Sequence, residues 1–164
     1  MHRLLVACVL ALSLVACGQK EGAPMDKTAE ASAAEAKAFL EKNAKEPGVV
    51  VLPSGLQYKI VRSGPSDGPR PGPRDQVQVH YEGKFIDGEV FDSSYVEGVP
   101  AVFTPAGVVP GWTEALQLMR PGDEWMIYLP PELGYGPDGG GRVPPNSVLT
   151  FKLELLAMRK IGGG

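Results

Sequence analysis

Cysteine and histidine are scarce in this chain of 164 residues, and each scarcity excludes a class of chemistry. Both cysteines lie within the first 17 residues, so the rest of the chain has no disulfide framework, no cysteine metal site and no cysteine nucleophile. The net charge is −3, and no run of Lys and Arg exceeds two residues. Nucleic-acid binding through a basic surface is therefore excluded as well.

The chain also has no hydrophobic run of the length that a membrane span needs. Its longest apolar run occupies residues 4–16 and follows the basic pair His2-Arg3. A membrane span needs roughly 20 residues, so this run is a signal-peptide core rather than a transmembrane helix. It ends in LVAC (14–17), which resembles the lipobox of bacterial lipoproteins. We therefore expect a signal peptide over 1–16 and a lipid-modified Cys17 that anchors the protein to the envelope membrane. The alternative is an ordinary secretory leader with an incidental cysteine.

Two further segments precede the main domain. Residues 17–31 are small, polar and aperiodic, which predicts a flexible tether. The capping-box pattern of Ser32 and Glu35 then opens a predicted spacer helix in the segment 32–48, which runs to about Lys45 before Pro47-Gly48 stops it. Phe39 and Leu40 are its only large apolar residues. A solvated spacer is favoured over a dimerisation arm, and we expect a monomer.

Short alternating segments dominate residues 49–160. Apolar and polar residues alternate over 56–60, 77–82, 125–129 and 149–155, which predicts strands with one buried and one wet face. Asp87-Gly88 predicts a hairpin with a type I′ turn.

The period changes to that of a helix between Pro110 and Pro121. Trp112, Ala115, Leu116 and Met119 stand at i, i+3, i+4 and i+7. A single short helix among antiparallel strands must bury this stripe against the concave side of a sheet. The fold class is therefore α+β.

Conventional catalytic sets are missing from this domain. Its only histidine, His80, alternates to the strand face opposite Val77, Val79 and Tyr81, the Gly139–Gly141 run lacks the Lys of a phosphate loop, and the acidic residues form no evident pair. We expect no metal and no cofactor. The notable feature is a set of aromatic residues at strand and helix ends, for each of which plain core packing is the alternative: Tyr81, Phe91, Trp112, Tyr135 and Phe151.

Six segments resemble one family in order and spacing: PSGLQY (53–58), VHYEG (79–83), FDSS (91–94), VPGW (109–112), LGYG (133–136) and PPN (144–146) running to FKLEL (151–155). Together they are similar to the FKBP-type peptidyl-prolyl cis-trans isomerases, in their bacterial, macrophage-infectivity-potentiator-like branch. The resemblance covers residues from about 37 to 160. It implies an antiparallel, half-open sheet wrapped around the Trp112 helix, with a pocket between them.

The resemblance also implies roles for individual residues. Trp112 matches the pocket floor, Tyr81, Phe91 and Phe151 match its walls, and Val108 and Val109 match a rim whose backbone meets the bound peptide. Tyr135 matches a hydroxyl that hydrogen-bonds a ligand carbonyl, and Asp92 matches the carboxylate beside the twisting amide. The catalytic assignment is Tyr81, Asp92 and Tyr135, and the substrate-binding assignment is Phe91, Val108, Val109, Trp112 and Phe151.

Three positions depart from the family pattern: Ala101 replaces an aromatic wall residue, Glu97 stands about where many members have a basic residue, and Arg142 occupies an often apolar position. The predicted function is nevertheless isomerisation of X-Pro bonds in exported proteins by an outer-membrane lipoprotein that faces the periplasm or the cell surface. Proline-containing polypeptides are the expected substrates and macrolides are candidate inhibitors. The alternatives are a proline-peptide binding or chaperone module with little turnover, and an envelope lipoprotein with a vestigial pocket.

Overall fold

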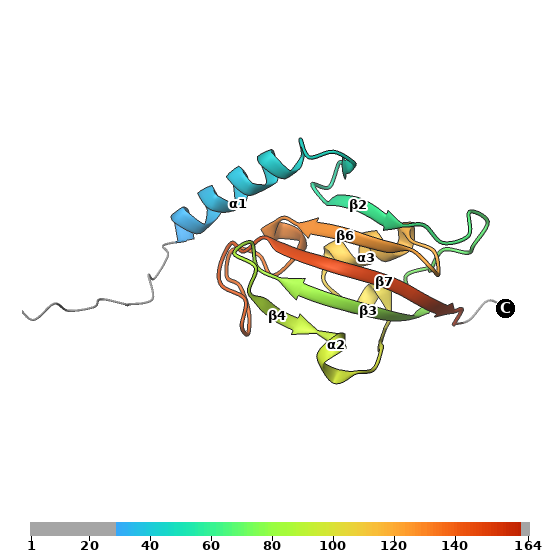
Figure 1. Cartoon of the computed structure of the whole chain (residues 1–164). Helices are drawn as coiled ribbons and strands as arrows, with labels where there is room; N and C mark the ends of the chain where they lie inside the picture. The colour runs from blue at the N-terminus through green and yellow to red at the C-terminus, as the bar shows by residue number, and fades with distance from the viewer. Residues whose placement is uncertain (1–28, 162–164) are drawn as a thin grey trace, which may run out of the picture.

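The computed structural model describes residues 29–161, which form one antiparallel sheet and a few short helices (Figure 1). The sheet has seven strands in the order β1-β2-β6-β7-β3-β4, and β5 pairs with β3 off this path. Among residues 29–161, every helix is too short or too polar to span a lipid bilayer. The strands are β1 (Val49–Val51), β2 (Gln57–Arg62), β3 (Gln76–Lys84), β4 (Val90–Ser93), β5 (Ala101–Phe103), β6 (Glu124–Leu129) and β7 (Leu149–Arg159).

Helix α3 (Pro110–Leu118) packs against one face of this sheet, as the predicted apolar stripe requires (Figure 1). Ala115, Leu116 and Met119 are completely buried, and Trp112 is 4% exposed. The facing side chains of β6 and β7 complete the core, because alternate residues from Trp125 to Leu129 and from Leu149 to Leu155 are buried. The predicted α+β class is confirmed, and the sheet is open.

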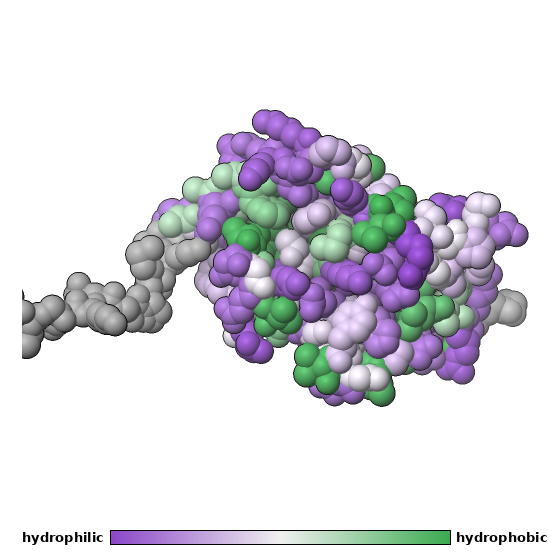
Figure 2. Space-filling view, viewed as in Figure 1, coloured by the Kyte–Doolittle hydropathy of each residue, from purple (hydrophilic) through white to green (hydrophobic). Residues whose placement is uncertain are grey.

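The other face of the sheet is wet, as Figure 2 shows by its predominantly hydrophilic colouring. Arg62 of β2 lies within ion-pair distance of Glu124 of β6 and Glu154 of β7, and Lys152 pairs with Glu124 at 3.3 Å. Such exposed pairs contribute little stability each. Their main effect is on strand register. A slip of one residue would turn these charged side chains toward the core, so they make any other register unfavourable.

The hairpin at Asp87-Gly88 is present, but the predicted type I′ turn is wrong. The N–H of Gly88 donates to the carbonyl of Phe85 (3.0 Å), and the N–H of Phe85 donates to the carbonyl of Glu89 (2.9 Å). Gly88 has φ +93°, whereas Asp87 does not have a positive φ. The loop is therefore a three-residue one that ends in a left-handed glycine, and Asp87 escapes the strain that a positive φ imposes on a side chain.

Helix α1 (Ala29–Asn43) starts three residues earlier and ends two residues earlier than predicted. Ser32 thus lies inside the helix, and residues 29–31 of the predicted tether are helical. Its C-terminal end is attached to the sheet, because Asn43 Nδ2 donates to Gln57 Oε1 (2.8 Å) and Gln57 Nε2 donates to the carbonyl of Leu40 (3.0 Å). The predicted signal peptide and Cys17 lie outside the described residues.

One further short helix and two single turns complete the described chain. Helix α2 (Ser94–Glu97) follows β4 directly, and Val96 in it is 85% exposed. The single turns η1 (Pro105–Gly107) and η2 (Pro131–Leu133) precede α3 and follow β6. Because η1 and α2 lie on either side of β5, they decide where the chain enters α3.

Candidate active site

The Trp112 indole, in the first turn of α3, is surrounded by aromatic rings. Tyr81 of β3, Phe103 of β5 and Phe151 of β7 meet it edge-on, with ring centroids 5.1, 5.6 and 5.2 Å away and interplanar angles of 82–90°. Edge-to-face contacts of this kind are favourable beyond the area that they bury. We call Tyr81, Phe91, Phe103, Trp112 and Phe151 the aromatic cluster, because Phe91 joins it through Phe151 (5.5 Å, 81°).

The polar edge of the cluster is the pair formed by Tyr81 and Asp92. The hydroxyl of Tyr81 donates to Asp92 Oδ2 at 2.8 Å, which joins a buried ring to an exposed carboxylate. Burial raises the pKa of Tyr81 above its ordinary value, and the hydrogen bond and the negative charges of Asp92 and Glu97 raise it further. Tyr81 is therefore a hydrogen-bond donor at neutral pH and not a base.

Val108 and Val109, the predicted rim residues, are half-buried and lead into α3. The carbonyl of Val109 accepts from the N–H of Trp112 at 3.0 Å, so this segment and the floor of the cluster are held together. Thr113 Oγ1 donates to the carbonyl of Pro105 at 2.6 Å and fixes η1 against the same helix turn. Within residues 29–161, no acceptor pairs with the N–H of Val109, which leaves one directed donor next to the cluster.

Tyr135 lies beyond η2 and is 45% exposed. The glycine-rich loop packs on its ring, because a Cβ added to Gly140 would lie 3.1 Å from Tyr135 Cδ1. Tyr135 is thus a partly exposed phenol supported by this loop, and its role as a hydrogen-bond donor to a ligand stays a prediction.

The loop after Tyr135 is closed by two hydrogen bonds between Gly140 and Val143, each 2.9 Å long. Arg142 reaches from it to β4, where Nη1 donates to the carbonyl of Phe91 at 3.3 Å and Nη2 lies 3.9 Å from Glu89 Oε1. The departure at Arg142 therefore links the loop to the strand that carries Phe91 and Asp92.

Phe103 is the main residue that sequence reasoning missed. Its neighbours Ala101 and Val102 give too short an alternating run to mark a strand by pattern. The structure pairs Phe103 with Val77 across β5 and β3, and this register turns its ring toward Trp112. Ala101, two residues earlier on β5, pairs with Val79 and is half-buried. Strand β5 therefore contributes its aromatic ring through Phe103 and not through position 101.

Gly83 is required by the packing of two of these rings. A Cβ added there would lie 2.7 Å from Phe151 Cε1 and 2.8 Å from Phe91 Cζ. Real Cβ atoms do not approach other atoms so closely, so any other residue would displace both rings. The glycine of the VHYEG segment is thus a packing residue of the site.

The arrangement has little capacity for acid–base or nucleophilic chemistry. His80 lies on the outer sheet face, where Nδ1 is 2.9 Å from Ser94 Oγ and the ring stacks on Tyr95 (4.8 Å, 13°). In the described part of the chain, no three His, Cys, Asp or Glu side chains are grouped so that they would hold a metal ion. The site offers an aromatic surface, one oriented carboxylate and, within residues 29–161, two unpaired donors, the backbone N–H of Val109 and the indole N–H of Trp112.

Comparison with protein families gives two matches along the chain. The model described as FKBP-type peptidyl-prolyl cis-trans isomerase matches residues 68–156. The model described as the domain amino terminal to FKBP-type peptidyl-prolyl isomerase matches residues 11–60. The first match includes every residue of the aromatic cluster.

Individual relatives agree with these matches. The chain is 49% identical over 142 residues to the outer membrane protein MIP of Legionella longbeachae, covering 86% of this chain and 60% of that protein. The crystal structure of FkpA from Escherichia coli superposes with a TM-score of 0.77 at 44% identity, covering 82% of this chain and 62% of that one. A peptidyl-prolyl cis-trans isomerase from Pseudomonas syringae pv. tomato gives a TM-score of 0.76 at 33% identity, covering 84% of this chain and 100% of that one. The chain spans between half and two thirds of the length of the curated relatives that it matches.

Proposed function

The chain belongs to the family of FKBP-type peptidyl-prolyl cis-trans isomerases, and we propose that it accelerates rotation about X-Pro bonds in exported polypeptides. The observation that carries this proposal is the ring of aromatic side chains around the Trp112 indole, with the Tyr81–Asp92 pair at its edge. A proline ring is apolar and compact, and it fits against such a surface.

The reaction needs no proton transfer and no covalent step. Amide resonance imposes a rotational barrier of ~18–20 kcal/mol, and each ~1.4 kcal/mol removed from it increases the rate about tenfold. Resonance places charge on the carbonyl oxygen, so removing water from this oxygen weakens resonance and favours the twisted amide. An aromatic surface that excludes water, together with a few oriented dipoles, is sufficient for this purpose.

Each group of the site has a part in this mechanism. Trp112 receives the proline ring, with Tyr81, Phe91 and Phe151 as walls, and Phe103 supports Trp112 from β5. The N–H of Val109, with Val108 beside it, and the hydroxyl of Tyr135 bind carbonyls of the peptide and hold it in register. Asp92, oriented by Tyr81, lies beside the rotating amide and interacts with its changing dipole.

A protease-coupled assay on X-Pro tetrapeptides tests the proposal. Protein that lacks residues 1–17 should accelerate isomerisation, and Tyr81→Ala should reduce kcat/KM about tenfold or more while the variant keeps its far-ultraviolet spectrum. Absence of acceleration would contradict the proposal. If proline peptides still bound to the inactive protein, the alternative of a binding or chaperone module would replace it.

We further propose that Cys17 carries the lipid anchor, that residues 1–16 are removed as a signal peptide, and that the isomerase domain over 49–160 is held at the envelope by the tether and spacer helix. The motif LVAC at 14–17 and the name of the Legionella relative, an outer membrane protein, support this proposal. The Cys17→Ser variant should lose palmitate labelling and detergent partitioning at an unchanged isomerase rate. Labelling that persists in this variant, or that needs Cys8 instead, would refute the anchor.

The remaining partners are also proposals. The attachment of α1 to its own sheet through Asn43, Gln57 and the contact of Phe39 with Tyr128 (6.3 Å) supports a monomer. Sedimentation equilibrium would decide this, since a dimer would give twice the mass. Macrolides that mimic a proline ring should compete with peptides at Trp112, and quenching of tryptophan fluorescence would measure their affinity.

A further inference from the structure

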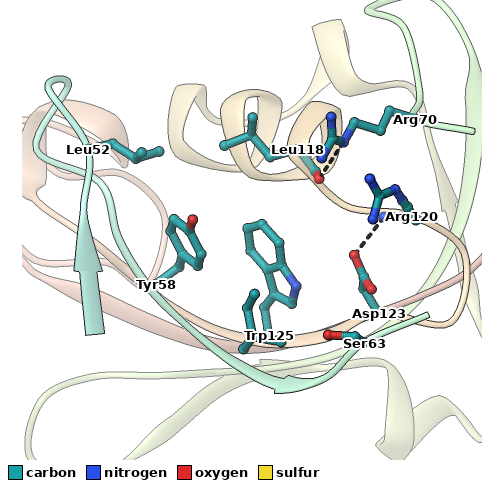
Figure 3. Close-up of a pocket in the computed structure, with 9 residues that line it drawn as sticks. Leu52, Tyr58, Ser63, Arg70, Leu118, Arg120, Asp123 and Trp125 are labelled. Carbon is teal, nitrogen blue, oxygen red and sulfur yellow. Dashed lines mark hydrogen bonds between the residues drawn. The ribbon is translucent and has the colours of Figure 1, made fainter. Parts of the chain in front are cut away.

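A cavity lies at the C-terminal end of α3, whereas the aromatic cluster surrounds the first turn of this helix. It has a volume of about 240 Å³, and β2, β6, the end of α3 and the segments on either side contribute to its lining (Figure 3). We call it the Trp125 cavity, after the residue at its centre. No member of the aromatic cluster lines it. Leu118, which does, is six residues after Trp112, or roughly 9 Å along the helix axis.

One half of the Trp125 cavity is apolar. The rings of Tyr58 and Trp125 stack with centroids 4.3 Å apart and an interplanar angle of 12°. Leu52 and Leu118 lie around this stack (Figure 3). An apolar cavity of about 150 Å³ admits benzene, so the volume here accommodates one large side chain and a small polar group.

The other half holds buried donors that have no acceptor. Trp125 is 4% exposed, and within residues 29–161 its indole Nε1–H has no hydrogen-bond partner. The Nε–H of Arg120, also buried, has none in the same part of the chain. Figure 3 shows the indole nitrogen of Trp125 on the side of the cavity where Arg120 lies. Leaving a buried donor unpaired costs about 1–3 kcal/mol, so an acceptor placed between these two groups would gain that energy.

The charged side chains around the Trp125 cavity favour the binding of an anion. Arg70 is held over the cavity because its Nε–H donates to the carbonyl of Leu118 at 3.0 Å, and neither Arg70 nor Arg120 forms an ion pair within the described residues. The one acidic lining residue, Asp123, already accepts from the backbone N–H groups of Gly64 (2.6 Å) and Arg120 (2.8 Å). Two guanidinium groups and one carboxylate leave one net positive charge, which a monoanion would balance.

We propose that the Trp125 cavity binds a carboxylate attached to a single apolar side chain. The carboxylate accepts from the Trp125 indole and the Arg120 guanidinium with Arg70 above it, and the apolar group lies along the Tyr58–Trp125 stack. A free N-acylated amino acid and the C-terminal residue of a peptide both have this chemistry. The site is independent of proline isomerisation, because it shares no side chain with the aromatic cluster.

The two tryptophans of the chain make a direct test possible, since one reports on each site. In ¹H–¹⁵N spectra of the full chain, the indole N–H of Trp125 should shift saturably when N-acetyl-phenylalanine is added, while that of Trp112 stays in place. The neutral amide of the same compound should bind at least tenfold more weakly, because it lacks the charge-assisted hydrogen bonds. Equal shifts with acid and amide, or with inorganic phosphate, would overturn the proposal.

Comparison of N-acetyl-phenylalanine with one peptide identifies the source of the carboxylate. N-acetyl-Gly-Gly-Phe with a free C-terminus contains no proline and should shift the same resonance if the natural ligand is a peptide end. If only the free amino-acid derivative binds, the ligand is a small carboxylate, and the site assignment still holds. If neither binds at millimolar concentration, the cavity is not a carboxylate site.

Variants separate recognition from folding. Arg120→Gln should weaken binding of N-acetyl-phenylalanine roughly 10- to 100-fold, because it replaces the charged guanidinium by a shorter, neutral amide. Arg74→Gln, at an exposed arginine between β2 and β3 that does not line the cavity, is the matched control and should bind as the parent does. Both variants should isomerise X-Pro peptides at the parent rate. Unchanged affinity in Arg120→Gln would refute the assigned contacts.

Discussion

Two tryptophans lie near the two ends of helix α3, Trp112 in its first turn and Trp125 on the neighbouring strand β6, and they share one unusual property but have different neighbours. Trp112 and Trp125 are each 4% exposed, and each has a buried indole N–H with no acceptor among residues 29–161. Around Trp112 the neighbours are three aromatic rings that meet it edge-on. Around Trp125 they are one stacked ring and two arginines.

The difference shows that the neighbours, rather than the residue type, decide what an indole surface does. An indole enclosed by apolar ring edges removes water from whatever rests on it, which suits a neutral amide in rotation. An indole next to guanidinium groups offers its N–H to an anion. The following experiments test this contrast, from the largest expected effect to the smallest.

Matched replacement of the two tryptophans by leucine should separate the two ends most clearly. Truncation of a buried Trp to Ala costs ~3–5 kcal/mol, and leucine retains part of the contact area, so both variants should lose stability but fold. Only Trp112→Leu should lower kcat/KM for X-Pro peptides, by about tenfold or more. Urea titration and the coupled assay measure the two effects. Comparable loss of activity in folded Trp125→Leu would remove the distinction.

Gly83→Ala should disturb the packing of the aromatic cluster and leave the surroundings of Trp125 unchanged. The new Cβ would overlap Phe151 and Phe91 at 2.7 and 2.8 Å, and overpacking of this kind costs ~1–3 kcal/mol. Gly107→Ala is the matched control, because a Cβ there meets nothing within 4 Å and its φ is not positive. Urea midpoints of the two variants measure the contrast. A midpoint for Gly83→Ala as high as that of the control would show that the rings adapt freely.

Tyr81 should make the aromatic cluster sensitive to alkali. Its pKa is raised in the folded state, so its contribution to stability is complete below the unfolded-state pKa of about 10 and is lost as the pH rises above that value. At one pH unit above it, the loss attributable to Tyr81 is about 1 kcal/mol. Tyr81→Phe should therefore show a smaller decrease in urea midpoint between pH 8 and pH 11 than the parent protein. Equal decreases in the two proteins would contradict the role of burial and of Asp92.

Replacement of Glu97 should give the smallest effect, a change in preference for the residue before proline. Its negative charge reaches Tyr81 and hence the edge of the aromatic cluster. Glu97→Arg should raise kcat/KM more for peptides with Leu or Phe before proline than for those with Lys or Arg, by ~0.2–1 kcal/mol, since the side chain is exposed. The difference should shrink in high salt. Identical ratios for both peptide classes in parent and variant would show that Glu97 has no part in substrate preference.

The local pattern of apolar and polar residues was sufficient to predict the regular helix α3 and strand β7. The i, i+3, i+4, i+7 stripe of Trp112 to Met119 and the alternation from Leu149 to Leu155 are buried as predicted, because burial follows the period of the backbone. It was insufficient for the start of α1 and for the Asp87-Gly88 turn. At both places neighbouring backbone geometries differ by little energy, and residues outside the segment decide between them.

The alternation and helical spacing of apolar residues were enough to predict which side chains face the core, and the order of the motif segments was enough to identify the family. Which of those side chains meet one another depends on how distant segments pack. Phe103 reaches Trp112 because β5 pairs with β3, and Arg70 reaches the Trp125 cavity because the segment after β2 returns to the end of α3. Whether a buried indole N–H finds an acceptor depends on every segment packed around it, and these segments are distant along the chain. This is the physical reason why both sites are made of residues that no single stretch of sequence brings together.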